Sequence, residues 1–381
     1  MNFCSDNRAQ SIQVGAVLLF GFLIIALTLY QAQGVPEENR QVEFEHSQQV
    51  GDEMVDLYTA VFETVVDGEP QPATITLGTE YNNRLFFIYP PPASGTLQTT
   101  ADKPVRLHNV TAVTDTNQSF DNYWDNTTRS YEAQAITYSP NYRVLRGTAD
   151  YRIEYGMLAA EYDESNTTEL RLAENHQPII DGDEIELVVI DGDLQSVDTD
   201  AESVIPERVT ESTEIEVTND SNTGLITLEL PTGLGEEQWN TTDPDDILHS
   251  EQEVENVSVN DGNATIRLNS STNYTLTIHK VDVGSGPTEP EPTYLQNVSY
   301  SGTDLKFKIR DRFHDPVDEG VDVWVFNASG DVDEKSTAEL ENPASNRSVR
   351  LTGVDSPCGI ALDDNIGTTE AYERINATGA C

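Results

Sequence analysis

The clearest chemical signal in the sequence is a target for covalent modification, the tripeptide Asn-x-Ser/Thr that accepts N-linked glycans. Fourteen of these sequons occur, whereas 26 Asn and 63 Ser and Thr among 381 residues would give about four by chance. Their asparagines are Asn109, Asn117, Asn126, Asn166, Asn219, Asn240, Asn256, Asn263, Asn269, Asn273, Asn297, Asn327, Asn346 and Asn376. This enrichment predicts a glycoprotein, and the crowding of Asn, Ser and Thr into turns is the alternative explanation for part of it.

The three cysteines allow one disulfide on the same side of the chain as the sequons. Cys358 and Cys381 lie near the C-terminus, whereas Cys4 precedes the only long apolar run. Because disulfides form outside the cytoplasm, we expect a bridge between Cys358 and Cys381. By loop-closure entropy, such a bridge would stabilise the folded state by about 3 kcal/mol. Neither cysteine has a second Cys or a His at ligand spacing, so a metal site is disfavoured.

Two Asp-Gly-Asp segments hold carboxylates at a spacing that calcium sites use. Asp181 and Asp183 precede the apolar run 184–190, and Asp191 and Asp193 follow it. Turn chemistry explains both segments first, because they bracket a predicted strand and the full calcium-binding loop pattern is missing. We therefore expect no cofactor, and calcium is the alternative at these two turns.

A cluster of aromatic and acidic residues at 120–125 is the one segment that suggests sugar binding. Its Tyr123 and Trp124 stand beside Asp121 and Asp125, and such groups stack on and hydrogen-bond to sugar rings. Aromatic residues of β-proteins belong more often to the core, and a glycan on the adjacent Asn126 would obstruct a cleft.

Recognisable enzyme motifs are absent from the sequence: it contains no GxSxG, no HExxH and no glycine-rich phosphate loop, and its six His are isolated. We expect a structural or adhesive surface protein rather than an enzyme, with other surface subunits or surface glycans as partners. A surface hydrolase that acts on polysaccharide through carboxylates hidden among the 67 acids is the alternative.

The net charge of −46 arises from 67 acidic and 21 basic residues, and the acids are dispersed over every segment beyond the N-terminus. Only five of the basic residues are Lys; sixteen are Arg. Self-repulsion of this size is tolerable where salt screens it within about 3 Å, as at molar ionic strength, so we predict a halophile's protein. An ordinary acidic secreted protein is the alternative. Nucleic acid is not expected as a partner, because clustered Lys and Arg are missing.

The apolar run Val14–Tyr30 contains a single polar residue, Thr28. With its flanks, residues 12–32 form a helix of about 32 Å, enough to cross the core of a bilayer. Arg8 precedes the run and the acidic bulk follows it. The positive-inside tendency therefore predicts a single-pass membrane protein with a cytoplasmic N-terminus and an extracellular bulk. A cleaved secretory signal is the alternative, although its apolar region is usually only about 7–15 residues long.

The segment Arg8-Ala9-Gln10-Ser-Ile-Gln-Val14, a short polar leader directly before a hydrophobic helix, resembles the precursors of archaeal type IV pilins. The resemblance covers about the first 30 residues. It implies a cytoplasmic leader at 1–9, cleavage between Ala9 and Gln10, a transmembrane helix at 10–34 and packing of that helix into a filament. Many pilins carry glutamate at the fifth mature position, where this chain has Val14. A plain membrane anchor is the alternative.

The segment 37–66 is predicted to form an amphipathic stalk helix. Pro36 is expected to break the helix before it, and apolar residues then recur at steps of three and four from Val50 to Val65. Two alternatives, a stalk that continues the anchor and a helix belonging to the first β-domain, predict the same buried face.

Short alternating runs after residue 67 predict strands, and their spacing suits a sandwich domain at 67–283. Residues 284–292, Gly-Ser-Gly-Pro-Thr-Glu-Pro-Glu-Pro, contain no apolar side chain and are predicted to be a stiff linker. The final domain, 293–381, has the length of an immunoglobulin-like sandwich.

The segment 311–325 of this final domain weakly resembles the strand-turn-strand of bacterial immunoglobulin-like surface modules, with His314 where such turns usually carry Gly or Asn. Val321, Val323 and Val325 are expected on one face of a strand, and Trp324 and Phe326 on the other. The predicted fold is therefore mainly β: a transmembrane helix and a stalk helix followed by two sandwiches.

Overall fold

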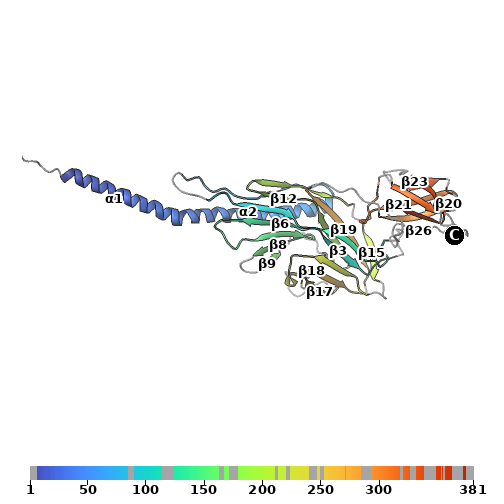
Figure 1. Ribbon diagram of the computed structural model, residues 1–381. Coiled ribbons are helices and arrows are strands. Elements are labelled where there is room, and N and C mark those ends of the chain that lie inside the picture. The colour runs from blue at the N-terminus through green and yellow to red at the C-terminus, as the bar shows by residue number, and fades with distance from the viewer. Residues whose placement is uncertain are drawn as a thin grey trace, which may run out of the picture.

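The computed structural model describes residues 7–84, 90–113, 123–162, 167–170, 179–210, 213–219, 224–239, 247–248, 253–270, 272–284, 293–317, 321–326, 332–338, 349–352, 354, 357–362 and 372–374. Within these residues the chain is mainly β. A long helix projects from one end, and two β-domains follow it in line (Figure 1). The predicted fold class is confirmed.

A continuous helix runs through three segments: α1 (Asn7–Leu29), the π-helical turn η1 (Tyr30–Gly34) and α2 (Val35–Asp67). The prediction that Pro36 breaks the helix is wrong. Pro36 lies in the first turn of α2, directly after η1, where the backbone N–H of Val35 donates to the carbonyl of Tyr30. The π-turn shifts the hydrogen-bond ladder just before the residue that cannot donate, and so the helix continues.

The predicted apolar face of α2 is buried. Phe62, which was predicted to share this face, is only half-buried. The other predicted members are less than 3% exposed and belong to one core cluster; they are Val50, Met54, Leu57, Tyr58, Val61 and Val65. The helix ends at Gly68, whose φ of 74° is left-handed and whose N–H donates to the carbonyl of Thr64 at 3.0 Å.

Three sheets and a short ribbon build the first domain. Sheet 1 has the order β12-β2-β6-β7-β8-β9. Its strands are β2 (Ser94–Thr99), β6 (Ile136–Asn141), β7 (Asp150–Glu154), β8 (Met157–Tyr162), β9 (Thr167–Leu170) and β12 (Gln195–Asp198). The ribbon pairs β1 (Ala73–Thr76) with β13 (Ala201–Val204).

Sheet 2 has the order β10-β11-β19-β15-β4, and β14 also pairs with β19. Its strands are β4 (Val110–Ala112), β10 (Ile180–Asp181), β11 (Glu184–Asp191), β14 (Pro206–Arg208), β15 (Ile215–Asn219) and β19 (Tyr274–Val283). Sheet 3 has the order β17-β18-β16-β3-β5. Its strands are β3 (Lys103–His108), β5 (Arg129–Ala133), β16 (Thr227–Pro231), β17 (Val254–Asn260) and β18 (Asn263–Leu268), and α3 (Glu236–Trp239) follows β16.

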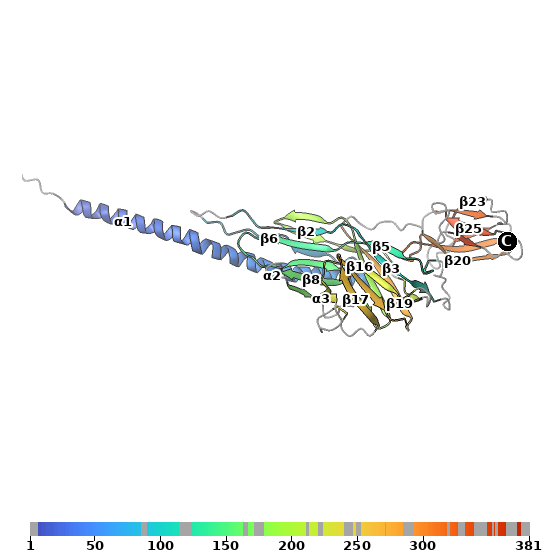
Figure 2. The same cartoon turned by 60° about the horizontal axis from the view of Figure 1, so that its bottom comes forward.

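Sheet 2 is buried on both faces and divides the domain into two cores. Along β11, Leu187 and Val189 belong to the core shared with sheet 3, whereas Val188 and Ile190 belong to the core that contains α2 and sheet 1. β11 and β19 are parallel, which fits strands that are apolar on both sides. Figure 2 shows β3, β16 and β17 of sheet 3 crossing over β19.

The final domain is a sandwich of a three-stranded and a four-stranded sheet among the described residues, as an immunoglobulin-like domain requires. The strands are β20 (Tyr294–Ser301), β21 (Asp304–Arg310) and β24 (Val349–Thr352) on one side, and β22 (Val321–Phe326), β23 (Val332–Ala338), β25 (Gly359–Leu362) and β26 (Tyr372–Arg374) on the other. Val323 and Val325 are buried and Trp324 and Phe326 are half-buried, as predicted. Of the predicted linker, only Gly284 lies within the described residues.

Candidate functional site

The helix α1 is exposed on every side from Gln13 to Leu29. Val17, Leu19 and Phe22 are each more than 70% exposed, although they are large apolar residues. Between Arg8 and Glu37 the chain carries no charge over 28 residues, about 42 Å of helix. Within the described part of the chain this helix is long and apolar enough to cross a membrane. A core helix of the same composition would be buried, so this segment is not part of the core of the β-domains.

A polar cluster lies at the junction where η1 meets α2. The Tyr30 hydroxyl donates to Glu38, and Arg84 donates to Glu38 at 2.8 Å and to the amide oxygen of Asn39 at 3.1 Å. The Tyr30 hydroxyl, and then the Arg84 guanidinium, hold the pKa of Glu38 below its usual range. Gly34 is required under the Tyr30 ring, because a Cβ there would lie 2.6 Å from a ring carbon.

Beyond this junction, a cleft of about 470 Å³ opens between α2 and the turn that joins β6 to β7. The helix contributes Phe44, Ser47 and Asp52, whereas the turn contributes Tyr142 and Arg146. The volume falls within the range of about 300–1,000 Å³ that small-molecule sites occupy. The cleft is therefore large enough to hold a ligand.

A buried carboxylate of α2 forms hydrogen bonds to the turn that makes up one wall of this cleft. Glu43 of α2 is 0% exposed and accepts backbone N–H bonds from Arg143 at 2.7 Å, from Val144 at 3.0 Å and from Leu145. The hydroxyl of Tyr81 also donates to Glu43. Charge-assisted bonds of this kind are about twice as strong as neutral ones, so the turn is held in place without a ligand.

His46, one turn further along α2, fixes the adjacent side chain of Tyr142. The carbonyl of Thr76 can only accept, so Nε2 of His46 donates to it at 3.1 Å, and Nδ1 accepts from the Tyr142 hydroxyl at 2.6 Å. Burial lowers the pKa of His46, which favours this neutral form. In β6, which ends directly before Tyr142, the Tyr138 hydroxyl donates to the carbonyl of Leu77 at 2.9 Å. Two aromatic rings of the cleft are thus preorganised.

A second polar cluster joins the two β-domains at the turn after β21. His314 is 2% exposed and has a left-handed φ of 72°, which explains why such turns usually carry Gly or Asn. The indole N–H of Trp124 donates to Nε2 of His314 at 3.1 Å, so Nδ1 carries the proton and donates to the Tyr294 hydroxyl at 2.7 Å. Burial, and then the charges of Arg310 and Arg129, lower the pKa of His314 to about 3.

Phe313, the residue directly before His314, makes a second contact between the domains, and we call the contacts of these two residues the latch. Phe313 packs against Tyr131 of β5 with ring centroids 5.2 Å apart, and the Tyr131 hydroxyl donates to the carbonyl of Arg312 at 3.2 Å. Phe313 and Tyr294 both belong to the core of the first domain. The two domains therefore share a core at this contact.

The described aromatic residues of the cluster at 120–125 belong to the core, which was the favoured interpretation, and do not form a sugar-binding surface. Tyr123 and Trp124 are 4% and 0% exposed and pack in the core beside His314. Their faces are covered by protein, because the domain contact uses them. Asp125 pairs instead with Arg129 at 3.1 Å, and Phe120 and Asp121 lie outside the described residues.

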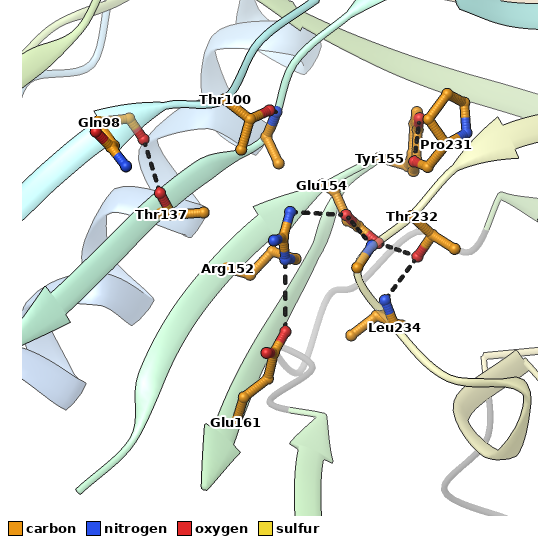
Figure 3. Close-up of polar contacts among 12 residues, drawn as sticks. Gln98, Thr100, Thr137, Arg152, Glu154, Tyr155, Glu161, Pro231, Thr232 and Leu234 are labelled. Atoms are coloured by element: carbon orange, nitrogen blue, oxygen red, sulfur yellow. Dashed lines mark hydrogen bonds and ion pairs between the residues drawn. The ribbon is translucent and has the colours of Figure 1, made fainter. Parts of the chain in front are cut away.

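A buried carboxylate also lies at the end of β7 (Figure 3). Glu154 accepts from the Thr232 hydroxyl and from the N–H of Gly233, and Arg152 lies 3.5 Å from it and 3.4 Å from Glu161. Burial raises the pKa of Glu154 despite these partners. The adjoining cavity measures about 100 Å³, below the range of ligand sites, so this carboxylate holds the turn after β16 in place.

The sequons of the described residues reach the surface to different degrees. Asn256, Asn269 and Asn273 are exposed, whereas Asn109, Asn126, Asn219, Asn263 and Asn297 are half-buried. The remaining sequons lie outside the described residues: Asn117, Asn166, Asn240, Asn327, Asn346 and Asn376. The Asn109 amide donates to the carbonyl of Leu225 at 2.9 Å, so this side chain also has a structural role.

The remaining candidate residues occupy the following places. Cys358 is disulfide-bonded, and Cys381 lies outside the described residues. Asp181 and Asp183 flank the turn of the β10–β11 hairpin around Gly182, whose φ is 58°. Asp191 pairs with Lys280 at 2.7 Å, and no group of three metal-binding side chains was found among the described residues. Ala9 and Gln10 lie in the first turn of α1.

Comparisons with known proteins give little further information. No family model matches the chain, and no solved structure matches it. A protein of the archaeon Archaeoglobus fulgidus, described only as an uncharacterized protein, is 34% identical over 93 residues. The matched part covers 24% of this chain and only 16% of that protein.

Proposed function

We propose that this protein is a membrane-anchored, N-glycosylated extracellular surface protein with a structural or adhesive role. The observation that carries the proposal is the continuous helix, which is exposed and uncharged in its first half and buried by one face in its second half. A helix of this kind anchors a rigid body to a bilayer. The junction at Tyr30, Glu38 and Arg84 and the latch at His314 then support a stiff arrangement of two domains beyond the membrane.

In the proposed orientation the N-terminus is cytoplasmic and the β-domains are extracellular. Arg8 before the helix, the acidic bulk after it and the sequons on one side of it favour this arrangement. A disulfide at Cys358 fits an oxidising compartment. The dispersed charge of −46 suits a cell surface bathed in concentrated salt.

We further propose that the chain is a minor pilin-like subunit, processed between Ala9 and Gln10. The long helix whose second half packs into a β-domain supports this proposal, as does the leader-like segment before it. The exposed face of α1 would then contact other subunits as well as lipid. Val14 at the fifth mature position, where many pilins carry glutamate, weighs against assembly into a filament more than against membrane insertion.

Protease treatment of intact cells, followed by mass spectrometry of the retained and released peptides, tests the proposal. We expect released peptides from both β-domains and a retained fragment that contains α1. Protection of β-domain peptides in intact cells, with release after lysis, would contradict the orientation. Reading the mature N-terminus in the same sample separates the two proposals, because a chain that begins at Met1 removes pilin-type processing alone.

A further inference from the structure

The walls of the cleft between α2 and the β6–β7 turn are held in place by buried hydrogen bonds. Glu43 and His46 fix its walls from inside the helix, and neither group faces the cavity. The hydroxyl groups of Tyr138 and Tyr142 are bonded to protein, so their rings are held in one position before a ligand arrives. Preorganisation of this kind lowers the entropic cost of binding.

The lining of the cleft is complementary to a ligand whose surface carries both apolar patches and hydroxyl groups. Nine of the sixteen lining residues carry a hydroxyl, amide or charged group, which disfavours a purely apolar ligand. The accessible aromatic members are Phe44, which is 45% exposed, and the half-buried Tyr162, whereas Tyr138, Tyr142 and Tyr151 are at most 7% exposed and form the floor of the cleft. Asp52 and Arg146 supply an acceptor and a planar set of donors at the exposed rim.

We propose that this cleft binds a saccharide, one or two hexose units in size. The C–H face of a sugar ring packs on Phe44 and Tyr162, the accessible aromatic side chains, and its hydroxyl groups bond to Asp52, Ser47 and Arg146. A phosphorylated ligand is disfavoured, because Asp52 lies in the same cleft and the whole chain is strongly acidic. The site goes beyond the proposed function and depends on it only for the distance to the membrane.

That distance leaves two sources for the saccharide. Phe44 and Asp52 lie eight and sixteen residues after Pro36, so the cleft begins about 12 Å and ends about 24 Å beyond the uncharged segment. A glycolipid headgroup in the same membrane reaches this height, and so does a glycan of the surrounding surface coat. Both present the same ring chemistry.

The test uses the full chain in phospholipid nanodiscs in molar KCl. NMR saturation transfer is measured to methyl glycosides of glucose, mannose, galactose and glucuronic acid at millimolar concentration. We expect transfer to at least one glycoside. Transfer to none of the four overturns the proposal.

Matched variants locate the site. Ser47→Phe fills the cleft and should abolish transfer, whereas Glu45→Phe places the same ring on an exposed position of α2 outside the cleft. Asp52→Asn should weaken binding about five- to tenfold, and Asp56→Asn, one turn along, should not. Phe44→Ala should weaken it about two- to tenfold. Unchanged binding in both Ser47→Phe and Asp52→Asn overturns the proposal.

A second set of nanodiscs that contain a monoglycosyl diether lipid separates the sources. Loss of transfer to the free glycoside in these discs identifies a lipid headgroup in the cleft. Retained transfer, together with binding of soluble oligosaccharides, identifies a coat glycan. The protease experiment on cells does not depend on binding, so failure of the cleft proposal leaves the surface assignment in place, and the reverse also holds.

Discussion

Replacement of His314 by Asn should make the protein less sensitive to acid than the wild type. The wild-type imidazole is neutral, with a folded pKa of about 3 against 6.5 for an ordinary His. Below pH 6.5 the unfolded chain binds a proton that the folded chain does not, so the free energy of unfolding falls by about 1.4 kcal/mol per pH unit. At pH 4 this loss is about 3 kcal/mol.

Asp311, three residues earlier, acts in the opposite direction. Burial raises its pKa from 3.8 to about 6, although it accepts the N–H groups of Phe313 and Asp315 at 2.8 and 2.9 Å. Between pH 6 and pH 3.8 the folded state therefore binds the extra proton, which adds about 2.4 kcal/mol to the free energy of unfolding by pH 4. In the wild type this gain offsets most of the loss that His314 causes at this pH.

The variants separate the two effects. Asn accepts the left-handed backbone at position 314, so His314→Asn keeps the turn, loses up to two buried hydrogen bonds and should be less stable at pH 7 by about 2–4 kcal/mol. On going from pH 7 to pH 4 it should gain about 3 kcal/mol relative to the wild type, and Asp311→Asn should lose about 2.4 kcal/mol relative to the wild type.

Denaturant titrations in molar KCl, followed by tryptophan fluorescence at both pH values, measure these differences. The other carboxylates titrate in all three proteins and cancel in the comparison. Equal pH dependence in the wild type and His314→Asn would refute the assignment of a neutral, buried imidazole at the domain contact.

Three further outcomes follow from buried polar groups. Glu43→Gln should lower the free energy of unfolding by about 2–4 kcal/mol in denaturant titrations, because three backbone N–H groups lose a charged acceptor. The control Glu45→Gln, on the exposed face of α2, should change the free energy of unfolding by less than about 0.5 kcal/mol. Glu154→Gln should leave the free energy of unfolding at pH 7 within about 1 kcal/mol of wild type. In the wild type the raised pKa of Glu154 lets the folded state take up a proton on acidification, which stabilises it, and the variant should lose this gain. An unchanged acid response in the variant would contradict this prediction. Asn109→Asp should lower the free energy of unfolding by about 1–3 kcal/mol in unglycosylated protein, because the bond to the Leu225 carbonyl is lost. Thr111→Val destroys the same sequon but removes a buried hydroxyl that has no hydrogen-bond partner, so it should leave the free energy of unfolding unchanged. Equal losses in the two variants would show that the Asn109 amide has no structural role.

Regular features of the fold could be predicted from the sequence because they depend on periodicity. The buried face from Val50 to Val65 follows a helical repeat, and the alternation around Trp324 follows the two-residue repeat of a strand. Pro36 misled the prediction, because a π-turn is set by the local hydrogen-bond ladder and leaves no periodic signal.

The polar sites could not be predicted, because their partners are far apart in the chain. Glu43 meets residues about 100 positions later, and Trp124 meets His314 across 190 positions. Among 67 acids one buried carboxylate has no distinguishing sequence pattern. The unusual His at a turn position was visible, but its meaning required the shared core between the domains.

The central claim is that one continuous helix is lipid-exposed in its first half and packed into the first domain in its second half. Nitroxide labels placed singly from Val14 to Val50 of the full chain in nanodiscs, read by their accessibility to oxygen and to a water-soluble nickel chelate, test it most directly. Labels from Val17 to Leu27 should be accessible to oxygen and shielded from nickel, and those on the exposed face after Glu37 should show the reverse. Nickel accessibility throughout the segment from Val17 to Leu27 would contradict the account.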